Sequence, residues 1–170
     1  MLEIVEGSKP VIAKVHGSAF AAGCQLVASC DLVLSTEDAM FATPGVNIGL
    51  FCSTPMVAVS RKVSKKRMMK MLLTGEAINA KYAKEIGLIN DYYSKTKLEK
   101  ETLSLARKIA SKSNLTIKIG KKAFYKQSEM SLRKAYKYTS KVMTENAMHF
   151  VAKEGISAFL EKRKPNWKNK

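Results

Sequence analysis

The sequence lacks any apolar run long enough to span a membrane, and Met1-Leu2-Glu3 does not begin like a secretory signal. Cysteine is also scarce, because three residues at positions 24, 30 and 52 form neither a disulfide framework nor a C-x-x-C metal motif. Cys24 and Cys30 lie in apolar sequence, which is typical of reduced core thiols. We therefore expect no metal site and no membrane partner, and a location in the cytoplasm, or in the mitochondrial matrix if the source is eukaryotic.

Arginine is rare although the chain is strongly basic. Lysine and arginine together number 30 and the net charge is +16, yet arginine occurs only at positions 61, 67, 107, 133 and 163. Base-reading surfaces use arginine forks and stacking aromatics, whereas lysines scattered along amphipathic helices form solvated faces. The composition therefore does not favour a nucleic-acid partner. With 170 residues and 46% hydrophobic content, the chain can form one domain with a substantial core.

The stretch from Pro10 to Asp31 organises the chain. Residues Val11 to Val15 form an apolar, β-branched run that predicts a buried strand, and Gly17 marks a turn. Small residues then lead into residues 24–28, which predict a helix buried on every side. A helix start offers unpaired N–H groups and the positive end of the dipole, so small residues there suit a ligand. A tight strand-to-helix turn without a ligand is the alternative.

Further along, the pattern predicts short strands and capped helices. Residues 32–34, 40–42 and 88–89 read as strands. Ser53 or Thr54, Ser64 and Asn79 are candidate helix caps, and Gly75 is a helix end. From about residue 98 onward the spacing of apolar residues is helical.

Several motifs in this order resemble the crotonase superfamily, the enoyl-CoA hydratase/isomerase family. They are residues 9–13, the Gly17 turn, 22–24, 30–31, 41–44, 73–75, 80–87 and 154–164. The resemblance implies an α/β fold, a crotonase-like ββα spiral followed by a helical C-terminal region. It implies a partial spiral core over 1–95 and a helical trimerisation region over 96–170, within one structural domain. The first turns of the family's spiral are expected to be missing at the N-terminus.

The resemblance also assigns roles at the predicted helix start. Family members bind acyl-CoA thioesters and stabilise an enolate-like oxyanion with two backbone N–H groups. Ala22 matches one donor, and the second lies in the family's N-terminal part. Gln25 and Gly45 occupy the positions of the two glutamates that handle water and its proton. Glutamine cannot accept and return a proton and glycine has no side chain, so we expect no hydration of enoyl-CoA.

Other residues fall at substrate-binding positions of the family. The resemblance implies such contacts for Ala21, Gly23, Asn47, Cys52, Phe159 and Lys162, with Thr43 and Ser53 in the same loop region. Phe159 and Lys162 would reach the adenosine phosphate end of coenzyme A from an adjacent subunit. Their alternative is a core phenylalanine and a solvated lysine. For Cys52, a resting core thiol is the alternative to a nucleophile.

Three further polar residues are read as structural. His16 follows the predicted strand and could act as a base, although a hydrogen-bonded structural histidine is the simpler reading. Asp31 is expected to bond a turn, and His149 to lie at a surface or interface.

The leading hypothesis is thus an acyl-CoA-binding family member of acyl-CoA and fatty-acid metabolism that lacks hydratase activity. The thioester is its ligand, no other cofactor is expected, and the chain forms a homo-oligomer, a trimer or a dimer of trimers. Whether it is an enzyme stays open. One alternative is an active crotonase-fold isomerase or hydrolase acting on another acyl-CoA. The other is a non-catalytic oligomerisation protein.

Overall fold

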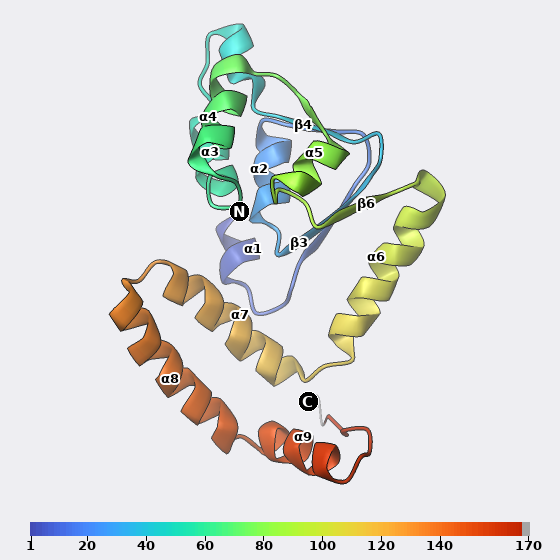
Figure 1. The fold of residues 1–170 in the computed structure, drawn as a ribbon, viewed down its shortest axis with the longest axis vertical. Helices are drawn as coiled ribbons and strands as arrows, with labels where there is room; N and C mark the ends of the chain where they lie inside the picture. The colour runs from blue at the N-terminus through green and yellow to red at the C-terminus, as the bar shows by residue number, and fades with distance from the viewer. Residues whose placement is uncertain (168–170) are drawn as a thin grey trace. The chain divides into compact units, whose positions relative to one another are not determined.

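The computed structural model describes residues 1–167. It divides into two compact units (Figure 1). The core unit contains Met1–Val5 and Val11–Ala106, and the helical unit contains Glu6–Pro10 and the residues from Arg107 onward. The predicted boundary at 95/96 falls at the start of α6 (Lys95–Ala110), the helix that leads from one unit into the other.

One sheet of the core unit is wholly parallel. It has the order β1-β3-β6, with β1 at Ile12–Val15, β3 at Leu32–Thr36 and β6 at Asp91–Tyr93. Ile12 pairs with Leu32, and Leu34 with Asp91. Two side chains extend the ladders: Asp31 Oδ2 accepts the Val11 amide at 2.7 Å, and Asn90 Oδ1 accepts the Val33 amide at 2.7 Å. Asp31 therefore has the structural role predicted from the sequence.

A second, smaller sheet has the order β2-β4-β5. Its strands are β2 (Ser18–Phe20), β4 (Met40–Ala42) and β5 (Ile78–Asn79); β2 and β4 are parallel, and β4 and β5 antiparallel. In this sheet Phe20 pairs with Ala42. The pairing brings the chain just before α2 (Ala22–Ser29) beside the end of β4.

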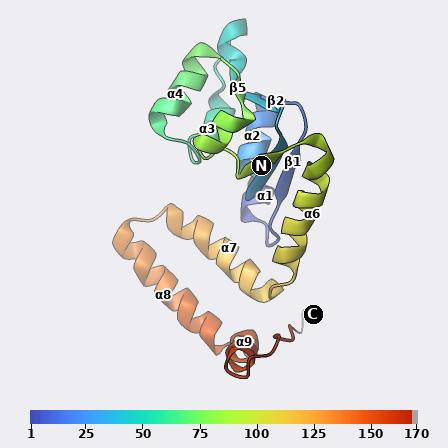
Figure 2. The ribbon, with the colours of Figure 1, turned by 45° about the vertical axis from the view of Figure 1, so that its right-hand side comes forward.

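Four helices and a short 3₁₀ segment pack with these sheets. After β4 come η1 (Pro44–Ile48), α3 (Ser53–Val59), α4 (Lys65–Thr74) and α5 (Ala80–Glu85). Figures 1 and 2 show α2 between α3 and the strands. Cys24, Val27, Phe41, Val59 and Leu72 are among the buried core residues. Each large apolar side chain removed from water contributes about 1.5–3 kcal/mol, so this cluster holds α2 firmly.

The ends of α4 and α5 follow the predicted signals. Gly75 ends α4 in the left-handed conformation, with φ of 64°, which glycine adopts without steric cost. The Asn79 side chain caps α5 by accepting the Tyr82 amide. On α4, Met68, Met71 and Leu72 are buried, as the helical spacing predicts. Methionine here serves as core filler.

The helical unit is built from three helices: α7 (Asn114–Ser128), α8 (Leu132–Met148) and α9 (Phe150–Leu160). Ser113 caps α7 through its side chain, and the buried Lys121 donates from Nζ to the Lys9 carbonyl at 2.9 Å. After α9, Arg163 binds both carboxylate oxygens of Glu154, at 2.7 and 3.0 Å. This fork folds the segment after α9 back along the helix.

Three local predictions are wrong. Leu26 of α2 is exposed, so this helix is not buried on every side. The strand predicted at 88–89 lies at Asp91–Tyr93, because Leu88 and Ile89 are buried in the turn that follows α5. Helix α3 is preceded by Cys52 at its N-cap rather than by Ser53 or Thr54. The first helix of the chain, α1, spans Leu2–Glu6.

Candidate functional site

The candidate site begins where β2 turns into α2. Ala21 makes this turn alone, with φ 47° and ψ −112°, a conformation that residues with a side chain rarely adopt. Its amide donates to the Ala42 carbonyl at 3.0 Å, and its carbonyl accepts the Gln25 amide at 3.0 Å. Both sides of the residue are therefore fixed, one to β4 and one to α2.

The fixed turn leaves the first amides of α2 without helical acceptors. Gln25 is the first residue of the helix that bonds four residues back, so Ala22, Gly23 and Cys24 precede the ladder. Within residues 1–167, the Ala22 amide donates no hydrogen bond, and Ala22 itself is exposed. Ala21, Ala22 and Gly23 carry no long side chain that could cover this amide.

Gly45 lies in η1, the second position at which the resemblance implied a glutamate. It is buried, and its amide donates to Cys52 Sγ at 3.3 Å while its carbonyl accepts the Leu50 amide at 3.0 Å. A Cβ added at Gly45 would lie 2.9 Å from the Leu50 carbonyl oxygen and 3.0 Å from Cys52 Sγ. The Leu50 carbonyl and the Cys52 thiol therefore occupy the space that a side chain at position 45 would need.

Cys52 also lies near Cys24 of α2. Burial raises the pKa of the Cys24 thiol to about 12, and the neighbouring Cys52 thiol adds to the shift. Both residues are buried, which suits the core reading of these thiols. Cys52 thus serves as a packing partner between α2 and Gly45.

Gln25 is half-buried on α2, one turn after Ala21. Its backbone carbonyl accepts the Ser29 hydroxyl at 2.8 Å. No hydrogen bond of its side-chain amide occurs within residues 1–167. The side chain can hold a water molecule but cannot exchange a proton with it at neutral pH.

The sequence did not indicate whether the Thr43 hydroxyl has a hydrogen-bond partner. It follows β4 directly, is buried, and its hydroxyl has no hydrogen-bond partner among the described residues. The register of β2 and β4 places Thr43 next to the pair Phe20–Ala42, at the turn made by Ala21. A buried hydroxyl normally has a hydrogen-bond partner, so the Thr43 hydroxyl is a polar group of the candidate site that is available to bind a ligand or water.

The remaining predicted residues are dispersed. The Asn47 side chain packs over Gly75, where an added Cβ would lie 2.9 Å from Asn47 Oδ1. Phe159 and Lys162 belong to the helical unit, and both are exposed. Lys162 has φ of 53°, because α9 ends at Leu160 and the chain reverses there. His16 is exposed after β1, and His149 separates α8 from α9.

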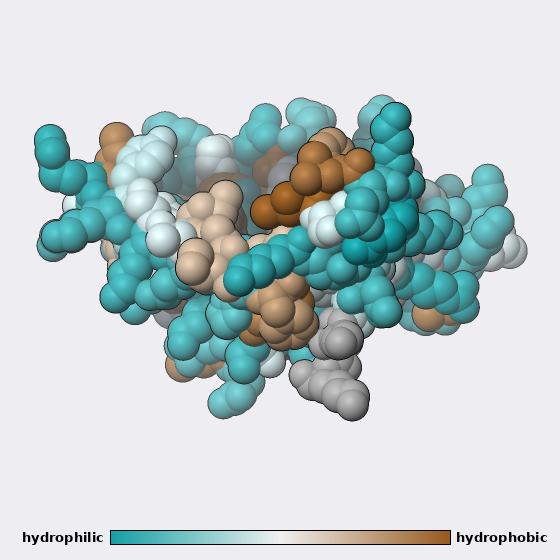
Figure 3. All heavy atoms as spheres, turned by 90° about the horizontal axis from the view of Figure 1, so that it is seen from below, coloured by the Kyte–Doolittle hydropathy of each residue, from teal (hydrophilic) through white to brown (hydrophobic). Residues whose placement is uncertain are grey.

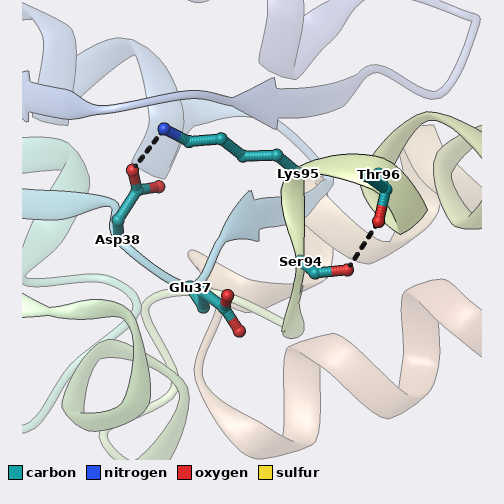
Figure 4. A pocket seen from close by; sticks show the side chains of 5 residues that line it. All are labelled: Glu37, Asp38, Ser94, Lys95 and Thr96. Atoms are coloured by element: carbon teal, nitrogen blue, oxygen red, sulfur yellow. Dashed lines mark hydrogen bonds and ion pairs between the residues drawn. The ribbon is translucent and has the colours of Figure 1, made fainter.

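A hollow of about 420 Å³ lies elsewhere in the core unit (Figure 4). Glu37, Asp38, Ser94, Lys95 and Thr96 line it. Asp38 pairs with Lys95 at 2.9 Å and Ser94 bonds Thr96 at 3.2 Å, as the dashed lines in Figure 4 show. None of the predicted site residues lines this hollow, and two of its charged groups, Asp38 and Lys95, pair with each other.

Among residues 1–167, no group of three histidine, cysteine or acidic side chains is arranged to hold a metal ion. In the same range, no helix has the length and apolarity needed to cross a bilayer.

Comparisons with known proteins agree with this architecture. The profile of the enoyl-CoA hydratase/isomerase family matches residues 1–170. The chain is 50% identical to human "Enoyl-CoA hydratase domain-containing protein 3, mitochondrial" over 98% of its length and 55% of that protein. It is 35% identical to 2,3-dehydroadipyl-CoA hydratase of Escherichia coli, over 96% of this chain and 64% of that protein.

Solved structures show the same fold. The structure of human enoyl-CoA hydratase domain-containing protein 3 superposes on this chain with a TM-score of 0.95 and 49% identity. The match covers 98% of this chain and 66% of the human one. An enoyl-CoA hydratase of Mycobacterium smegmatis gives a TM-score of 0.96 and 48% identity, covering 98% and 65%. The crotonase-like α/β fold predicted from the motifs is confirmed.

The chain spans about half the length of these curated relatives. Within that span, the run of motifs, the fold and the match to the family profile agree. This chain belongs to the enoyl-CoA hydratase/isomerase family.

Proposed function

We propose that this chain contributes an acyl-CoA thioester site that binds its ligand without hydrating it. The Ala22 amide faces the thioester carbonyl and donates a hydrogen bond to the oxygen as negative charge develops there. The fixed turn at Ala21 supports this proposal, because within residues 1–167 the Ala22 amide has no hydrogen-bond acceptor. Gly23 adds no side chain that would block the ligand.

The packing of Gly45 carries the second half of the proposal. Hydration needs two carboxylates that position water and move its proton. Position 25 supplies an amide side chain and position 45 none, and the Leu50 carbonyl and Cys52 thiol leave no room for one. The site therefore lacks both proton carriers, and one of them is excluded by the backbone itself.

Calorimetry and an activity assay test this function together. The purified chain is titrated with coenzyme A, butyryl-CoA and crotonyl-CoA, and crotonyl-CoA hydration is followed by loss of the conjugated double bond. We expect weak binding of the thioesters and hydration at the background rate. Absence of any binding would overturn the thioester site, and hydration well above background would overturn the loss of activity.

An active enzyme on another acyl-CoA is the first alternative. Thr43 and Gln25 provide polar groups for such a reaction, although neither is a proton carrier near pH 7. Mass spectrometry of a panel of acyl-CoAs incubated with the chain distinguishes this function, since an isomerase or thioesterase would change the mass or retention of one of them.

Oligomerisation is the second candidate, and the helical unit favours it. Its helices α8 and α9 expose large apolar side chains, namely Leu132, Tyr136, Met143, Met148, Phe150, Ile156, Phe159 and Leu160. Figure 3 views the chain from below, from the side of α9, and shows tan and brown apolar side chains among teal charged ones. Apolar surface of this extent is typical of an interface between subunits. We propose a homo-oligomer, a trimer or a dimer of trimers.

Phe159 exposes 81% of its surface. In such an assembly it would contact, together with Lys162, the adenosine phosphate end of coenzyme A bound to a neighbouring subunit. Analytical ultracentrifugation of the chain and of Met143→Ser tests the assembly, and we expect the variant to dissociate at higher concentration than the parent. A monomeric parent would contradict it. The relatives' mitochondrial names support a mitochondrial matrix location and a role in acyl-CoA metabolism.

A further inference from the structure

The segment between Asp38 and Glu76 has an unusual charge pattern. It contains no acidic residue, yet it carries six basic ones, at positions 61, 62, 65, 66, 67 and 70. This segment includes η1, α3 and α4. Two of its cations pair with glutamates outside it, Arg67 with Glu85 and Lys70 with Glu76, both in exposed pairs.

Exposed apolar side chains lie within the same segment. Ile48 and Leu50, in and just after η1, expose 76% and 64% of their surface, and Leu73 of α4 exposes 62%. The two elements are in contact, because the Asn47 side chain packs over Gly75 at the end of α4. Figure 1 shows the η1 segment beside that end of α4.

Helix α4 divides into two faces. Met68, Met71 and Leu72 are buried in the core. Lys66, Met69, Lys70 and Leu73 recur at helical spacing on the opposite, exposed face. We call Ile48, Leu50, Lys66, Met69, Lys70 and Leu73 the η1–α4 face. It alternates apolar and cationic side chains, and all six residues belong to the core unit.

The chemistry of this face selects among partners. A second copy that met this face with its own η1–α4 face would bring the same cations against it, and like charges across an interface repel. A nucleic acid would neutralise the lysines but would leave Ile48, Leu50 and Leu73 without an apolar contact. An anionic lipid surface satisfies both, because cations bind its headgroups while apolar side chains enter the acyl boundary. We propose that the η1–α4 face docks peripherally on an anionic bilayer.

This docking differs from the sequence expectation of no membrane partner, which rested on the length of apolar runs and therefore excluded only a spanning segment. Lys66 has no ion pair among the described residues, and Lys70 lies 3.7 Å from Glu76 in an exposed pair. Exposed pairs of this kind are weak, so both lysines can turn to lipid phosphates.

Vesicle co-sedimentation of the full chain tests the proposal. The probes are vesicles of phosphatidylcholine alone and vesicles containing about one third phosphatidylserine. We expect binding to the anionic vesicles only, with loss of binding at about 1 M salt, where screening acts over roughly 3 Å. Lys66→Gln with Lys70→Gln should weaken binding roughly twenty-five-fold, fivefold for each lysine. Ile48→Ser with Leu50→Ser should weaken it at least about tenfold.

Matched controls come from α6 and α7, which belong neither to the η1–α4 face nor to the apolar side chains of the proposed subunit interface. Lys118→Gln with Lys122→Gln, and Leu103→Ser with Phe124→Ser, replace exposed residues and should leave vesicle affinity within about twofold of the parent chain. Circular dichroism and sedimentation confirm that each variant stays folded. Failure to bind anionic vesicles would overturn the proposal, and so would equal weakening by both pairs of lysine variants. If the η1–α4 variants instead change the oligomeric state and no lipid binding occurs, the face contacts another copy of the chain.

Discussion

The Gly45 amide donates a hydrogen bond to the Cys52 thiol across 3.3 Å, and the same contact fills the space where a side chain at position 45 would begin. This relationship bears on the proposal that position 45 is where the resemblance implies a glutamate, because a carboxylate cannot simply be placed there. A substitution at Gly45 must first displace Cys52 or the Leu50 carbonyl.

Gly45→Ala should therefore destabilise the chain. The added Cβ would lie 2.9 Å from a backbone oxygen, and overpacking of this kind costs about 1–3 kcal/mol in the free energy of unfolding. Urea denaturation measures the change. Gly120→Ala is the matched control, because Gly120 lies within α7 and its added Cβ would meet nothing within 4 Å. It should raise stability by about 0.5–1 kcal/mol. Equal effects of the two substitutions would refute the overpacking.

Gln25→Glu should not create hydratase activity. The substitution supplies one carboxylate on α2, but position 45 offers no second proton carrier. Steady-state hydration of crotonyl-CoA should remain at background for the variant, while its thermal stability stays close to that of the parent because Gln25 is only half-buried. Clear turnover by the single variant would show that one carboxylate is sufficient in this site.

Replacing Ala21 by glycine should stabilise the chain, whereas replacing its neighbour should not. Ala21 has φ 47° and ψ −112°, a conformation that costs about 1–3 kcal/mol with a side chain, and glycine removes most of this cost. Ala22 occupies the first helical position, so Ala22→Gly should lower the free energy of unfolding by up to about 1 kcal/mol. Opposite signs in urea denaturation are the expected result. A loss of stability in both variants would show that Ala21 is not strained.

The Cys24 thiol should resist labelling in the native state. Burial raises its pKa to about 12, so it stays protonated and inaccessible at pH 8, and modification should follow global unfolding. Mass spectrometry after alkylation with and without urea locates the label. Rapid native labelling of Cys24 would show that α2 opens locally.

The raised pKa of Cys24 also sets a pH dependence of stability. Between the thiol's ordinary pKa and about 12, the unfolded chain loses this proton and the native chain keeps it, so stability falls as pH rises. Cys24→Ala should flatten this alkaline slope. An unchanged slope in the variant would show that titrating groups other than the Cys24 thiol cause the loss of stability at alkaline pH.

A second pH effect is expected at the pair of Lys84 and Asp91, which are 2.8 Å apart. The hydrogen bond from Lys84 lowers the pKa of Asp91, so its contribution is present above the ordinary aspartate pKa and is lost as pH falls through the lowered value. Asp91→Asn should be less stable than the parent at neutral pH and equal to it in strong acid. Lys84→Gln should show the same convergence, and a gap that persists in acid would point to lost packing.

Much of the core unit could be predicted because its signals are local. The β-branched run predicted the strand Ile12–Val15. Gly75 ends α4 in the left-handed conformation that the absence of a side chain permits, and Asn79 caps α5 through its side chain. The run of family motifs identified the fold because several weak signals occurred in one order. Leu26 shows the limit of composition: the helix around it is apolar, yet which side faces the core depends on elements distant in sequence.

The geometry of the candidate site could be read from the sequence only in part, for a related reason. Ala22, Gln25 and Gly45 could be chosen from their positions in the motifs, but the bond from Gly45 to Cys52 depends on how a seven-residue segment closes on itself. Nor does the sequence reveal that the buried Thr43 hydroxyl has no hydrogen-bond partner within residues 1–167, since this depends on the depth at which β4 ends. The strand Ser18–Phe20 was not predicted, because this short segment beside the Gly17 turn shows no clear alternation of polar and apolar side chains.

The parallel sheet of the core unit has a consequence for biosynthesis. The side-chain bonds that extend its ladders join residues 20 and 57 positions apart, and both pairings require a crossover. Such distant closures are slow compared with helix formation. Since β6 ends at Tyr93, the third strand cannot be added until that residue has emerged from the ribosome. During synthesis the nascent chain thus presents an unfinished β3 edge, which is where chaperones would be expected to act.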